Sequence, residues 1–363
     1  MKLAIFLMDL GGGGAERVMI NLAHGFLDRG MEVDLVLVKA EGPYLSQLSP
    51  QIKVITFNCS RLIFSLPALI KYLRKIRPAV LMSALEDTNL LALWASRLAN
   101  VPTQVVVTVH NNLSREAQNS EQLKRQLTPR LVQIFYPWAD KIVAVSAGVA
   151  KDLIKLGLPL EKVHYIYNPI VTSGLKEKLQ ENLDHPWFLP GQPPVILGVG
   201  RLTKQKDFST LMHAFSKVRH HKPVRLVLLG DGEEKTALET LAQSLGLAQE
   251  VSFLSFVANP YIYMSKASVV VLSSAWEGFG NVLVESMMTG TPVVSTDCES
   301  GPAEILADGK YGRLVSVGNT EEMAKAILDT FSNPPQREIL EERANEFTLE
   351  KSISCYQLLL ENL

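Results

Sequence analysis

Two glutamates, Glu277 and Glu285, stand eight residues apart around the junction of a loop and a helix. The apolar run at 268–272 predicts a buried parallel strand before them, and Gly290 and Pro292 predict the end of a helix of about three turns. A Gly-containing loop between a strand and a helix N-terminus favours an anion, because backbone N–H groups and the helix dipole meet there. Carboxylates repel phosphate, so we expect the amides to bind a phosphate and the carboxylates to bind sugar hydroxyls. The alternative is a solvated loop glutamate and a helix glutamate stabilised by the dipole.

A pair of cations, Arg201 and Lys206, follows the strand predicted at 195–200. Ligands of open parallel sheets bind outside the carboxyl ends of the strands. Arg201 can hold a diphosphate through two N–H groups, and Lys206 adds a point charge. Basic loop residues are commonly just solvated, but in a part of the chain that is otherwise net acidic this pair favours an anion site.

Four consecutive glycines, at 11–14, separate a strand predicted at 2–10 from a helix predicted at 15–28. This order is the geometry of a phosphate cradle, because glycine lets the backbone approach a phosphate or a sugar closely. We therefore expect Gly12, Gly13 and Gly14 to contact a phosphate or the acceptor. The alternative is a tight turn with no ligand.

A dinucleotide-binding fingerprint does not fit this glycine loop. The G-x-G-x-x-G pattern would need glycine where Glu16 or Arg17 stands, and Lys39 occupies the place of the expected acidic residue. We do not expect a nicotinamide or flavin cofactor.

His110 ends an apolar strand predicted at 104–109. It is either a structural residue with satisfied hydrogen bonds or a group that reaches a substrate hydroxyl or phosphate at the carboxyl edge of the sheet. The sequence contains no D-x-D motif and no His/Cys cluster, so we expect no metal ion held by carboxylates. Arg201, Lys206 and helix termini would then neutralise a leaving diphosphate.

The elements around these residues form two series of alternating strands and helices in a chain of 363 residues, which predicts two α/β domains with parallel sheets. We expect an N-terminal domain at 1–169, a Pro- and Gly-rich linker at 170–194 and a C-terminal domain at 195–348. An apolar-periodic helix at 349–363 could pack on either domain. The three cysteines are widely separated, which fits a reducing cytoplasm.

The charge is unevenly distributed along the chain. Residues 1–169 carry 19 Lys and Arg against 13 Asp and Glu, whereas the remainder carries 17 against 24. A basic first half favours an anionic acceptor or an anionic membrane surface, with the helix around Lys71, Arg74, Lys75 and Arg77 as the contact; charge drift without function is the alternative. No transmembrane helix or signal peptide is expected.

Several of these motifs, in this order, resemble the group 1, or family 4, retaining glycosyltransferases. They are Gly13-Gly14-Ala15-Glu16, the run at 199–207, Gly230-Asp231-Gly232, and the E-x7-E motif formed by Glu277 and Glu285. The similarity covers nearly the whole chain and is strongest over 187–314. It implies the GT-B fold, with two Rossmann-like domains whose parallel sheets face each other across a cleft, and a C-terminal helix that returns to the first domain.

The resemblance also implies roles for individual residues. Glu277 and His110 would act at the transferred sugar, and Gly12, Gly13 and Gly14 would line the phosphate or acceptor loop. The residues expected to bind the donor are Arg201, Lys206, Glu285, Gly278, Phe279, Gly280, Asn281 and Phe256. One position departs from the family pattern: Ser255 stands where relatives usually have Gly, in a stretch that tends to line the nucleotide base.

The function implied is transfer of a hexosyl or N-acetylhexosaminyl group, with retained configuration, from a nucleotide-diphosphate sugar to a hydroxyl, with UDP as the expected nucleotide. No cofactor, metal or nucleic acid is expected. The acceptor would be a sugar or a lipid-linked glycan in oligosaccharide or surface polysaccharide synthesis, at the inner face of the cell membrane. The alternatives are a GT-B sugar-nucleotide epimerase, a glycosyl phosphorylase and a non-catalytic protein that binds a sugar nucleotide.

Overall fold

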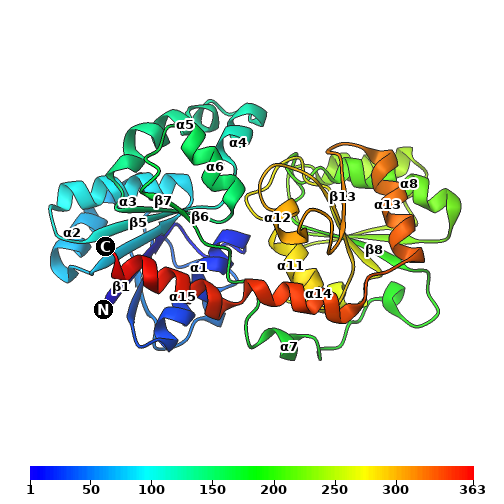
Figure 1. The fold of residues 1–363 in the computed structure, drawn as a ribbon, viewed down its shortest axis with the longest axis horizontal. Helices are drawn as coiled ribbons and strands as arrows, with labels where there is room; N and C mark the ends of the chain where they lie inside the picture. Colours follow the sequence, from blue (N-terminus) through cyan, green and yellow to red (C-terminus); the bar gives the residue numbers. More distant parts are fainter. The chain divides into compact units, whose positions relative to one another are not determined.

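The computed structural model describes residues 1–363, apart from the side chain of Lys176. The chain forms two compact units, one made of Met1–Ile170 together with Leu349–Leu363 and the other of Val171–Thr348 (Figure 1). The segment that the sequence suggests as a linker, 170–194, belongs almost entirely to the second unit. It contains the short helix α7 (Leu175–Lys178) and a single 3-10 turn, η4 (Pro186–Phe188).

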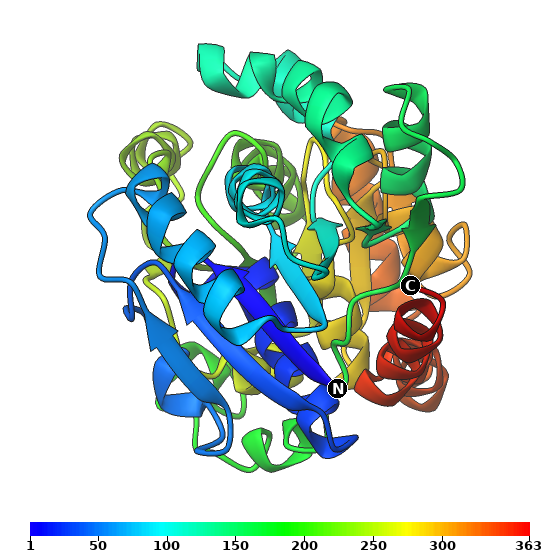
Figure 2. The same cartoon turned by 90° about the vertical axis from the view of Figure 1, so that its left-hand side faces the viewer.

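The first unit is built on a seven-stranded parallel sheet with the order β3-β2-β1-β4-β5-β6-β7. The strands are β1 Lys2–Leu7, β2 Glu32–Leu37, β3 Lys53–Thr56, β4 Val80–Ala84, β5 Gln104–Val109, β6 Lys141–Ala144 and β7 Val163–Tyr165. Helices lie on both sides of this sheet (Figure 2). Because both faces are covered, the central strands are continuous apolar runs rather than alternating ones.

The helices of the first unit are α1 Gly14–Asp28, α2 Leu66–Ile76, α3 Glu86–Ala99, α4 Leu113–Asn119, α5 Leu123–Phe135, α6 Ala147–Lys155 and α15 Leu349–Glu361. The C-terminal helix α15 packs on α1. The rings of Phe26 and Tyr356 meet edge to face with centroids 6.0 Å apart, and Ser352 donates a hydrogen bond to the carbonyl of Tyr167 over 2.8 Å.

The second unit has a six-stranded parallel sheet with the order β10-β9-β8-β11-β12-β13. Its strands are β8 Val195–Val199, β9 Arg225–Leu229, β10 Val251–Leu254, β11 Val269–Leu272, β12 Val293–Thr296 and β13 Arg313–Val315. Its longer helices are α8 Phe208–His221, α9 Lys235–Ser244, α10 Pro260–Lys266, α11 Asn281–Met288, α12 Pro302–Leu306, α13 Thr320–Ser332 and α14 Arg337–Ala344. The two parallel sheets confirm the predicted fold class.

Three predicted elements have different bounds in the structure. The first strand ends at Leu7 rather than at residue 10, because the chain turns away where the Asp9 carboxylate accepts a hydrogen bond from the Gly11 N–H. The stretch 115–136, where the residue pattern predicts one long helix, forms two helices, α4 and α5, separated at Ser120, whose backbone is extended. The helix that carries Glu285 has 8 residues, and is therefore shorter than the three turns expected.

Candidate functional site

The loops that follow β8 and β11 form one joined surface, because these two strands are neighbours in the second sheet. Ala275 donates its N–H to the carbonyl of Gln205 over 2.8 Å, and Gln205 donates its side-chain amide to the carbonyl of Trp276 over 3.0 Å. The hydroxyl of Ser273 donates to the carbonyl of Lys206 over 2.8 Å. These hydrogen bonds fix the position of the loop that carries Arg201 and Lys206 relative to the loop that carries Glu277.

An ion pair between Lys206 and Glu277 lies at the centre of this surface. The ammonium contacts Oε1 of the carboxylate, and the same oxygen accepts a hydrogen bond from the hydroxyl of Ser274 over 2.6 Å. The side chains of Lys206 and Glu277 are 16% and 7% exposed, so water screens the pair only in part. An ammonium has three protons, and Lys206 can therefore hold Glu277 and a phosphate oxygen at the same time.

The thiol of Cys298 is buried near this ion pair. Burial, reinforced by the negative charge of Glu277, raises its pKa to about 12. A thiol with that pKa stays protonated at neutral pH, and the thiolate is the nucleophilic form of cysteine. Cys298 is therefore not a candidate nucleophile.

The N-terminus of α11 follows directly after Glu277. Gly280 precedes this helix with φ of +97°, a conformation that glycine adopts at little cost, and no side chain caps the helix start. The ring of Phe279 is 2% exposed and packs on Phe347 with centroids 5.5 Å apart. A ligand at this turn would therefore meet the backbone of Gly278 to Asn281 rather than the phenyl ring.

Glu285 lies one turn into α11 and is buried, with Tyr261 of α10 nearby. The tyrosine hydroxyl donates to Oε1 of Glu285 over 3.4 Å, which is long for a hydrogen bond of this type. A carboxylate can exchange such a weak contact for a stronger donor, such as a ribose hydroxyl.

Phe256 follows β10 and is an exposed aromatic ring, with 48% of its surface accessible. Its backbone N–H donates to Oδ2 of Asp231 over 2.9 Å, and Asp231 lies in the Gly-Asp-Gly turn after β9. This N–H and the side chain of Ser255 hold the pKa of Asp231 below its usual value. The serine that departs from the family pattern thus helps to fix the Phe256 backbone. Arg201, also exposed, follows β8 at the same edge of the sheet.

His110 directly follows β5 in the first unit, and its hydrogen-bond partner Thr108 favours one neutral tautomer of the ring. Its Nε2 lies 2.9 Å from the hydroxyl of Thr108, and that hydroxyl donates to the carbonyl of Ser83 over 2.9 Å. Because a threonine hydroxyl has a single proton, both contacts are hydrogen bonds only in the tautomer whose Nε2 donates to Thr108, and in that tautomer Nδ1 is the acceptor. Burial lowers the pKa of His110 to about 4, so the imidazole is uncharged at neutral pH.

A buried amide supports the strand end that carries His110. Asn89 of α3 donates to the carbonyl of Thr108 and to the hydroxyl of Tyr136, each over 2.9 Å, and accepts from the hydroxyl of Ser83 over 2.7 Å. Satisfied polar networks of this kind rigidify a core. The position of His110 is therefore set by β4, β5 and α3 together.

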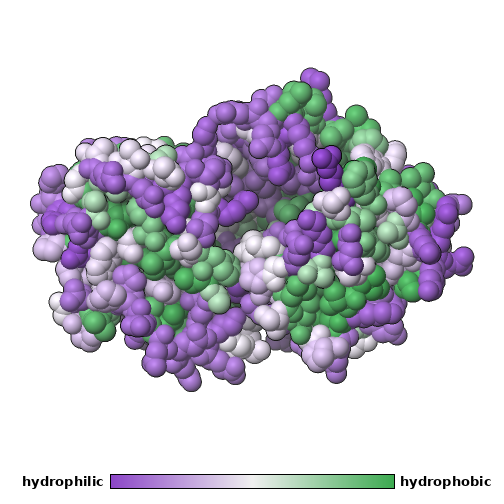
Figure 3. All heavy atoms as spheres, turned by 180° about the vertical axis from the view of Figure 1, so that it is seen from behind, coloured by the Kyte–Doolittle hydropathy of each residue, from purple (hydrophilic) through white to green (hydrophobic). Residues whose placement is uncertain are grey.

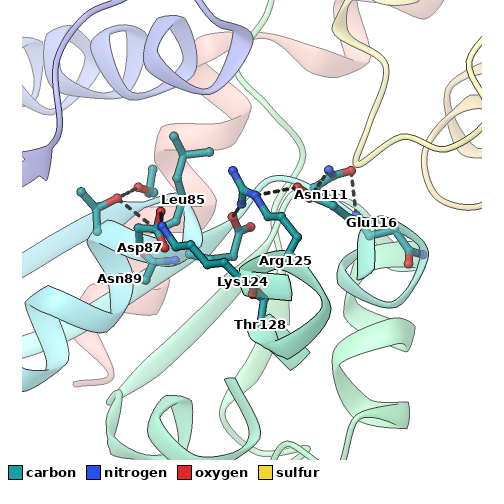
Figure 4. A network of polar contacts seen from close by, with 12 residues as sticks. Leu85, Asp87, Asn89, Asn111, Glu116, Lys124, Arg125 and Thr128 are labelled. Atoms are coloured by element: carbon teal, nitrogen blue, oxygen red, sulfur yellow. Dashed lines mark hydrogen bonds and ion pairs between the residues drawn. The ribbon is translucent and has the colours of Figure 1, made fainter. Parts of the chain in front are cut away.

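An ion network that sequence reasoning missed lies at the next strand end (Figure 4). The Arg125 guanidinium lies 3.3 Å from the Glu86 carboxylate and 3.4 Å from the Glu116 carboxylate, while Lys124 pairs with Asp87 over 2.5 Å. Oε1 of Glu86 is buried with no partner among the described residues. Burial, followed by the charge of Glu116, raises the pKa of Glu86.

The position of Glu86 connects this network to the predicted site. It follows β4, which lies between the strands that carry the glycine loop and His110. The sequence signal is a Glu-Asp pair directly after an apolar strand, but nothing in the sequence indicates that α5 supplies the cations.

The glycine loop after β1 has charged groups of both signs beside it. The hydroxyl of Tyr44 donates to the carbonyl of Gly12 over 3.0 Å and accepts from Arg17 over 3.1 Å. Glu16 lies in the first turn of α1, with its carboxylate against Gly13. Gly12, Gly13 and Gly14 therefore lie beside one carboxylate and, through Tyr44, one guanidinium.

The predicted residues thus gather at the carboxyl edge of the sheet in each unit. Arg201, Lys206, Glu277, Glu285 and Phe256 lie at strand ends or in the next helix of the second unit, and His110 and the glycine loop lie at strand ends of the first. Among the described residues, no group of three or more His, Cys, Asp or Glu side chains is placed to hold a metal ion. Among the same residues, no helix is long and apolar enough to span a membrane.

Two family profiles match the chain. "Glycosyl transferases group 1" matches residues 180–347, and "Glycosyltransferase Family 4" matches residues 12–173. The N-acetylgalactosamine-N,N'-diacetylbacillosaminyl-diphospho-undecaprenol 4-alpha-N-acetylgalactosaminyltransferase of Campylobacter jejuni is 30% identical over 94% of this chain and 93% of its own length. The lipopolysaccharide core biosynthesis glycosyltransferase LpsE of Rhizobium meliloti is 29% identical over 92% of this chain and 90% of its own length.

Solved structures share the fold over the full chain. The Anabaena protein HepE in complex with UDP-glucose is 23% identical with a TM-score of 0.81, covering 100% of both chains. Sucrose-phosphate synthase from Thermosynechococcus elongatus is 21% identical with a TM-score of 0.83, covering 100% of this chain and 98% of that one. These similarities confirm the predicted GT-B fold class of two Rossmann-like units.

Proposed function

Because this chain belongs to the group 1 and family 4 glycosyltransferases, we propose that it transfers a hexosyl or N-acetylhexosaminyl group from a UDP-sugar to a hydroxyl, with retained configuration. The observation that carries the proposal is the Lys206–Glu277 ion pair beside the N-terminus of α11. This arrangement brings one cation, one carboxylate and a helix N-terminus together in the loops that follow β8 and β11.

The donor would bind along the carboxyl edge of the second sheet. Arg201 and Lys206 supply two positive charges for a diphosphate, and the α11 N-terminus adds backbone N–H groups. Glu285 would accept hydrogen bonds from the ribose, replacing the weak contact with Tyr261. The exposed ring of Phe256 would stack on the base.

The reaction would proceed by front-face substitution. The bond between the anomeric carbon and the diphosphate oxygen breaks, the acceptor oxygen bonds to the same face, and the acceptor proton passes to the departing phosphate oxygen. Charge on the leaving diphosphate then dominates the barrier, so preorganised cations and N–H groups are the main catalytic device. This step needs no protein base, which agrees with a neutral His110 whose Nδ1 can only accept a hydrogen bond.

Glu277 and His110 would position the transferred sugar. The contacts of Lys206 and Ser274 with the Glu277 carboxylate both fall on Oε1, so Oε2 is the oxygen we assign to a sugar hydroxyl. Nδ1 of His110 would accept from a second hydroxyl, and Gly12, Gly13 and Gly14 would contact the acceptor.

The acceptor would be a sugar or a lipid-linked glycan. Two of the relatives are named for an undecaprenol-linked acceptor and for lipopolysaccharide core synthesis, which supports oligosaccharide or surface polysaccharide synthesis at the inner face of the cell membrane. The chemistry assigned to the residues uses no metal ion or other cofactor, so activity should survive a chelator.

The first experiment is a thermal-shift panel of UDP-sugars, GDP-mannose and free UDP, followed by product analysis with and without acceptor sugars. A donor at 100 times its Kd would stabilise the folded protein by about 2.7 kcal/mol. Failure of every nucleotide to stabilise the protein would contradict the proposal.

Product analysis separates the alternatives. Conversion of the donor to another sugar nucleotide without acceptor would indicate an epimerase, and dependence on inorganic phosphate would indicate a phosphorylase. Binding without any turnover would indicate a non-catalytic binding protein.

A further inference from the structure

The order of the strands marks one position at the carboxyl edge of each sheet. In the second unit the chain runs outward from β8 to β10 on one side and from β11 to β13 on the other, so its direction reverses between β8 and β11. Ligands of open α/β sheets bind outside the carboxyl ends of the strands at such a reversal. The ion pair of Lys206 and Glu277 lies in the loops at this point.

The first unit has the same arrangement of strands. The chain runs outward from β1 to β3 on one side and from β4 to β7 on the other, and β1 pairs with β4 in a register that puts Phe6 opposite Ser83. The reversal therefore lies between the glycine loop after β1 and Glu86 after β4. Both Glu86 and Glu277 follow the fourth strand of their own sheet.

The backbone just before Glu86 has an unfavourable conformation. Leu85 has φ of +72° and ψ of 144°, a region that only glycine adopts readily. Its carbonyl accepts from the hydroxyl of Thr88 over 3.0 Å and from the N–H of Asn89 over 2.9 Å. These contacts hold a sharp turn that makes Glu86 the first residue of α3.

The carboxylate of Glu86 is buried and only half satisfied. Hydrophilic residues cover much of the surface on the side of the molecule that Figure 3 shows, but Glu86 is 5% exposed. Its Oε2 lies 3.3 Å from the Arg125 guanidinium, and its Oε1 has no partner among the described residues. A buried acceptor without a donor is destabilising, so its presence in a folded protein calls for a functional reason.

Arg125 has a second partner, and this partner connects Glu86 to the segment after β5. Nε of Arg125 lies 3.4 Å from the Glu116 carboxylate, which accepts from the side chain of Asn111 over 2.6 Å (Figure 4). Asn111 directly follows His110. Arg125 can therefore remain on Glu116 when Glu86 turns to a ligand, and the network ends at the residue next to His110.

The charge of this network favours an uncharged ligand. Its carboxylates are those of Glu86, Asp87 and Glu116, and its cations are Lys124 and Arg125. Three carboxylates against two cations leave no cation in the network for an acidic ligand. A hydroxyl can donate to Oε1 of Glu86 without adding charge.

We propose that Glu86 is a specificity-determining residue that binds a hydroxyl of an uncharged acceptor sugar and disfavours an acidic sugar at the same position. The hydroxyl would donate to the carboxylate oxygen that has no partner, and Arg125 would stay on Glu116. The inference rests on the proposed function, because it assigns the sugar that receives the transferred group to the first unit.

The probes are the neutral methyl glycosides of glucose, galactose, N-acetylglucosamine and N-acetylgalactosamine. Saturation-transfer NMR measures their binding to the full chain with and without UDP, and transfer kinetics follow for those that bind. Glu86→Met removes both carboxylate oxygens at a similar side-chain length. It should weaken glycoside binding by about 10–100-fold, the range for a lost hydrogen bond to a charged group, and leave the Kd for UDP unchanged.

The matched control for this variant is Glu250→Met. Glu250 is also a partly buried carboxylate beside an arginine, 3.2 Å from Arg219, but it precedes β10 at the amino edge of the second sheet. Its substitution should leave both glycoside binding and UDP binding as in the parent protein.

Glu86→Gln separates a direct contact from a structural role. The amide keeps an acceptor oxygen and loses the charge, so the affinity for neutral glycosides should stay within about threefold of the parent value. The affinity for methyl glucuronide relative to methyl glucoside should rise about fivefold, because a repelling charge is gone. A residue that only stabilises the fold would not change this ratio.

Three results would overturn the proposal: no binding of any neutral glycoside to the parent protein, unchanged glycoside affinity in folded Glu86→Met, or an unchanged ratio of glucuronide to glucoside affinity in Glu86→Gln. Circular dichroism checks folding, and if Glu86→Met does not fold, the ratio in Glu86→Gln decides. Glycoside binding is measured without nucleotide as well, so it tests the acceptor site independently. Failure of every nucleotide to bind would contradict the proposed transfer alone.

Discussion

Lys206 and Glu277 join two loops of the second unit through an ion pair whose acceptor oxygen is also held by Ser274. The cation that we assign to the donor diphosphate is therefore already bound to a carboxylate when no donor is present. Substrate binding must share or displace this contact. Changes at the two residues should have opposite effects on nucleotide affinity.

Glu277→Gln should lower the transfer rate by about 10²–10³-fold while leaving the Kd for UDP equal to or below that of the parent protein. The amide keeps the Ser274 contact but no longer competes for the ammonium. Lys206→Met should raise the Kd for UDP by at least tenfold, on the order expected for a lost charge-assisted bond. Isothermal titration with UDP and a transfer assay measure both. Equal weakening of UDP binding by the two variants would contradict the roles assigned to Lys206 and Glu277.

Thr108→Val should alter the tautomer of His110 without removing the ring. Valine has the shape of threonine but cannot accept the Nε2 proton, so the fixed neutral form loses its partner. We expect mixed tautomers in the nitrogen NMR signals of labelled histidine and a transfer rate at least tenfold lower. Thr108→Ser keeps the hydroxyl and should restore both. A variant with normal tautomer signals but low activity would indicate a purely structural role for Thr108.

The lowered pKa of His110 predicts how stability changes with pH. The pKa is about 4 in the folded protein and about 6.5 in an unfolded chain. Between these pH values the unfolded state binds more protons than the folded state. The contribution of His110 to the free energy of unfolding is therefore present above pH 6.5 and is lost as the pH falls towards 4. Its full size is at most about 3 kcal/mol. Denaturant unfolding of His110→Gln should show a smaller loss between pH 7 and 4.5 than the parent protein. Identical pH dependence of the two proteins would be evidence against this assignment.

Glu86→Gln should stabilise the protein at neutral pH or leave it unchanged. The folded pKa of Glu86 is raised, so its protonated form is favoured in the folded state and stability is lost as the pH rises through the ordinary pKa of glutamate. Glutamine resembles the protonated form at every pH, and the difference from the parent should therefore vanish in acid.

Arg125→Met tests the same network from the other side. It should destabilise the protein by about 3 kcal/mol, because it leaves the buried carboxylate of Glu86 unpaired. Denaturant unfolding should show that Glu86→Gln partly rescues this loss. Additive effects of the two substitutions would mean that the residues are not coupled.

Phe256→Ala should raise the Kd for UDP by about tenfold, which corresponds to the loss of one stacked ring. Phe256→Tyr keeps the ring and should bind UDP like the parent protein. Val317→Ala, another exposed apolar position of the second unit, is the matched control. Unchanged affinity for UDP in Phe256→Ala would show that the ring is not at the base.

The sequence predicted most of the elements that carry the candidate site. Apolar runs located β1, β8 and β11, because parallel strands covered on both faces have a distinctive composition. The elements that were missed are short or polar, as with β13 (Arg313–Val315) and α14 (Arg337–Ala344). Local patterns are weak there, and packing decides the conformation.

The sequence indicated which residues belong to the candidate site better than it indicated which of them contact one another. Sequence placed Lys206 and Glu277 at two strand ends of the same sheet, but their pairing depends on the order of strands in that sheet. Glu86 was missed for the same reason, since its cations come from a helix more than thirty residues later. The roles of the individual residues remain predictions until the variants are measured.

Helix α15 has a consequence for how the protein is made. The first unit contains both ends of the described chain, and the whole second unit is inserted between residues 170 and 349. During synthesis the face of α1 that includes Phe26 must stay uncovered while the second unit emerges, until Tyr356 and its neighbours leave the ribosome. A nascent chain that stops before residue 349 thus has a folded second unit beside a first unit with part of its core exposed to chaperones and proteases.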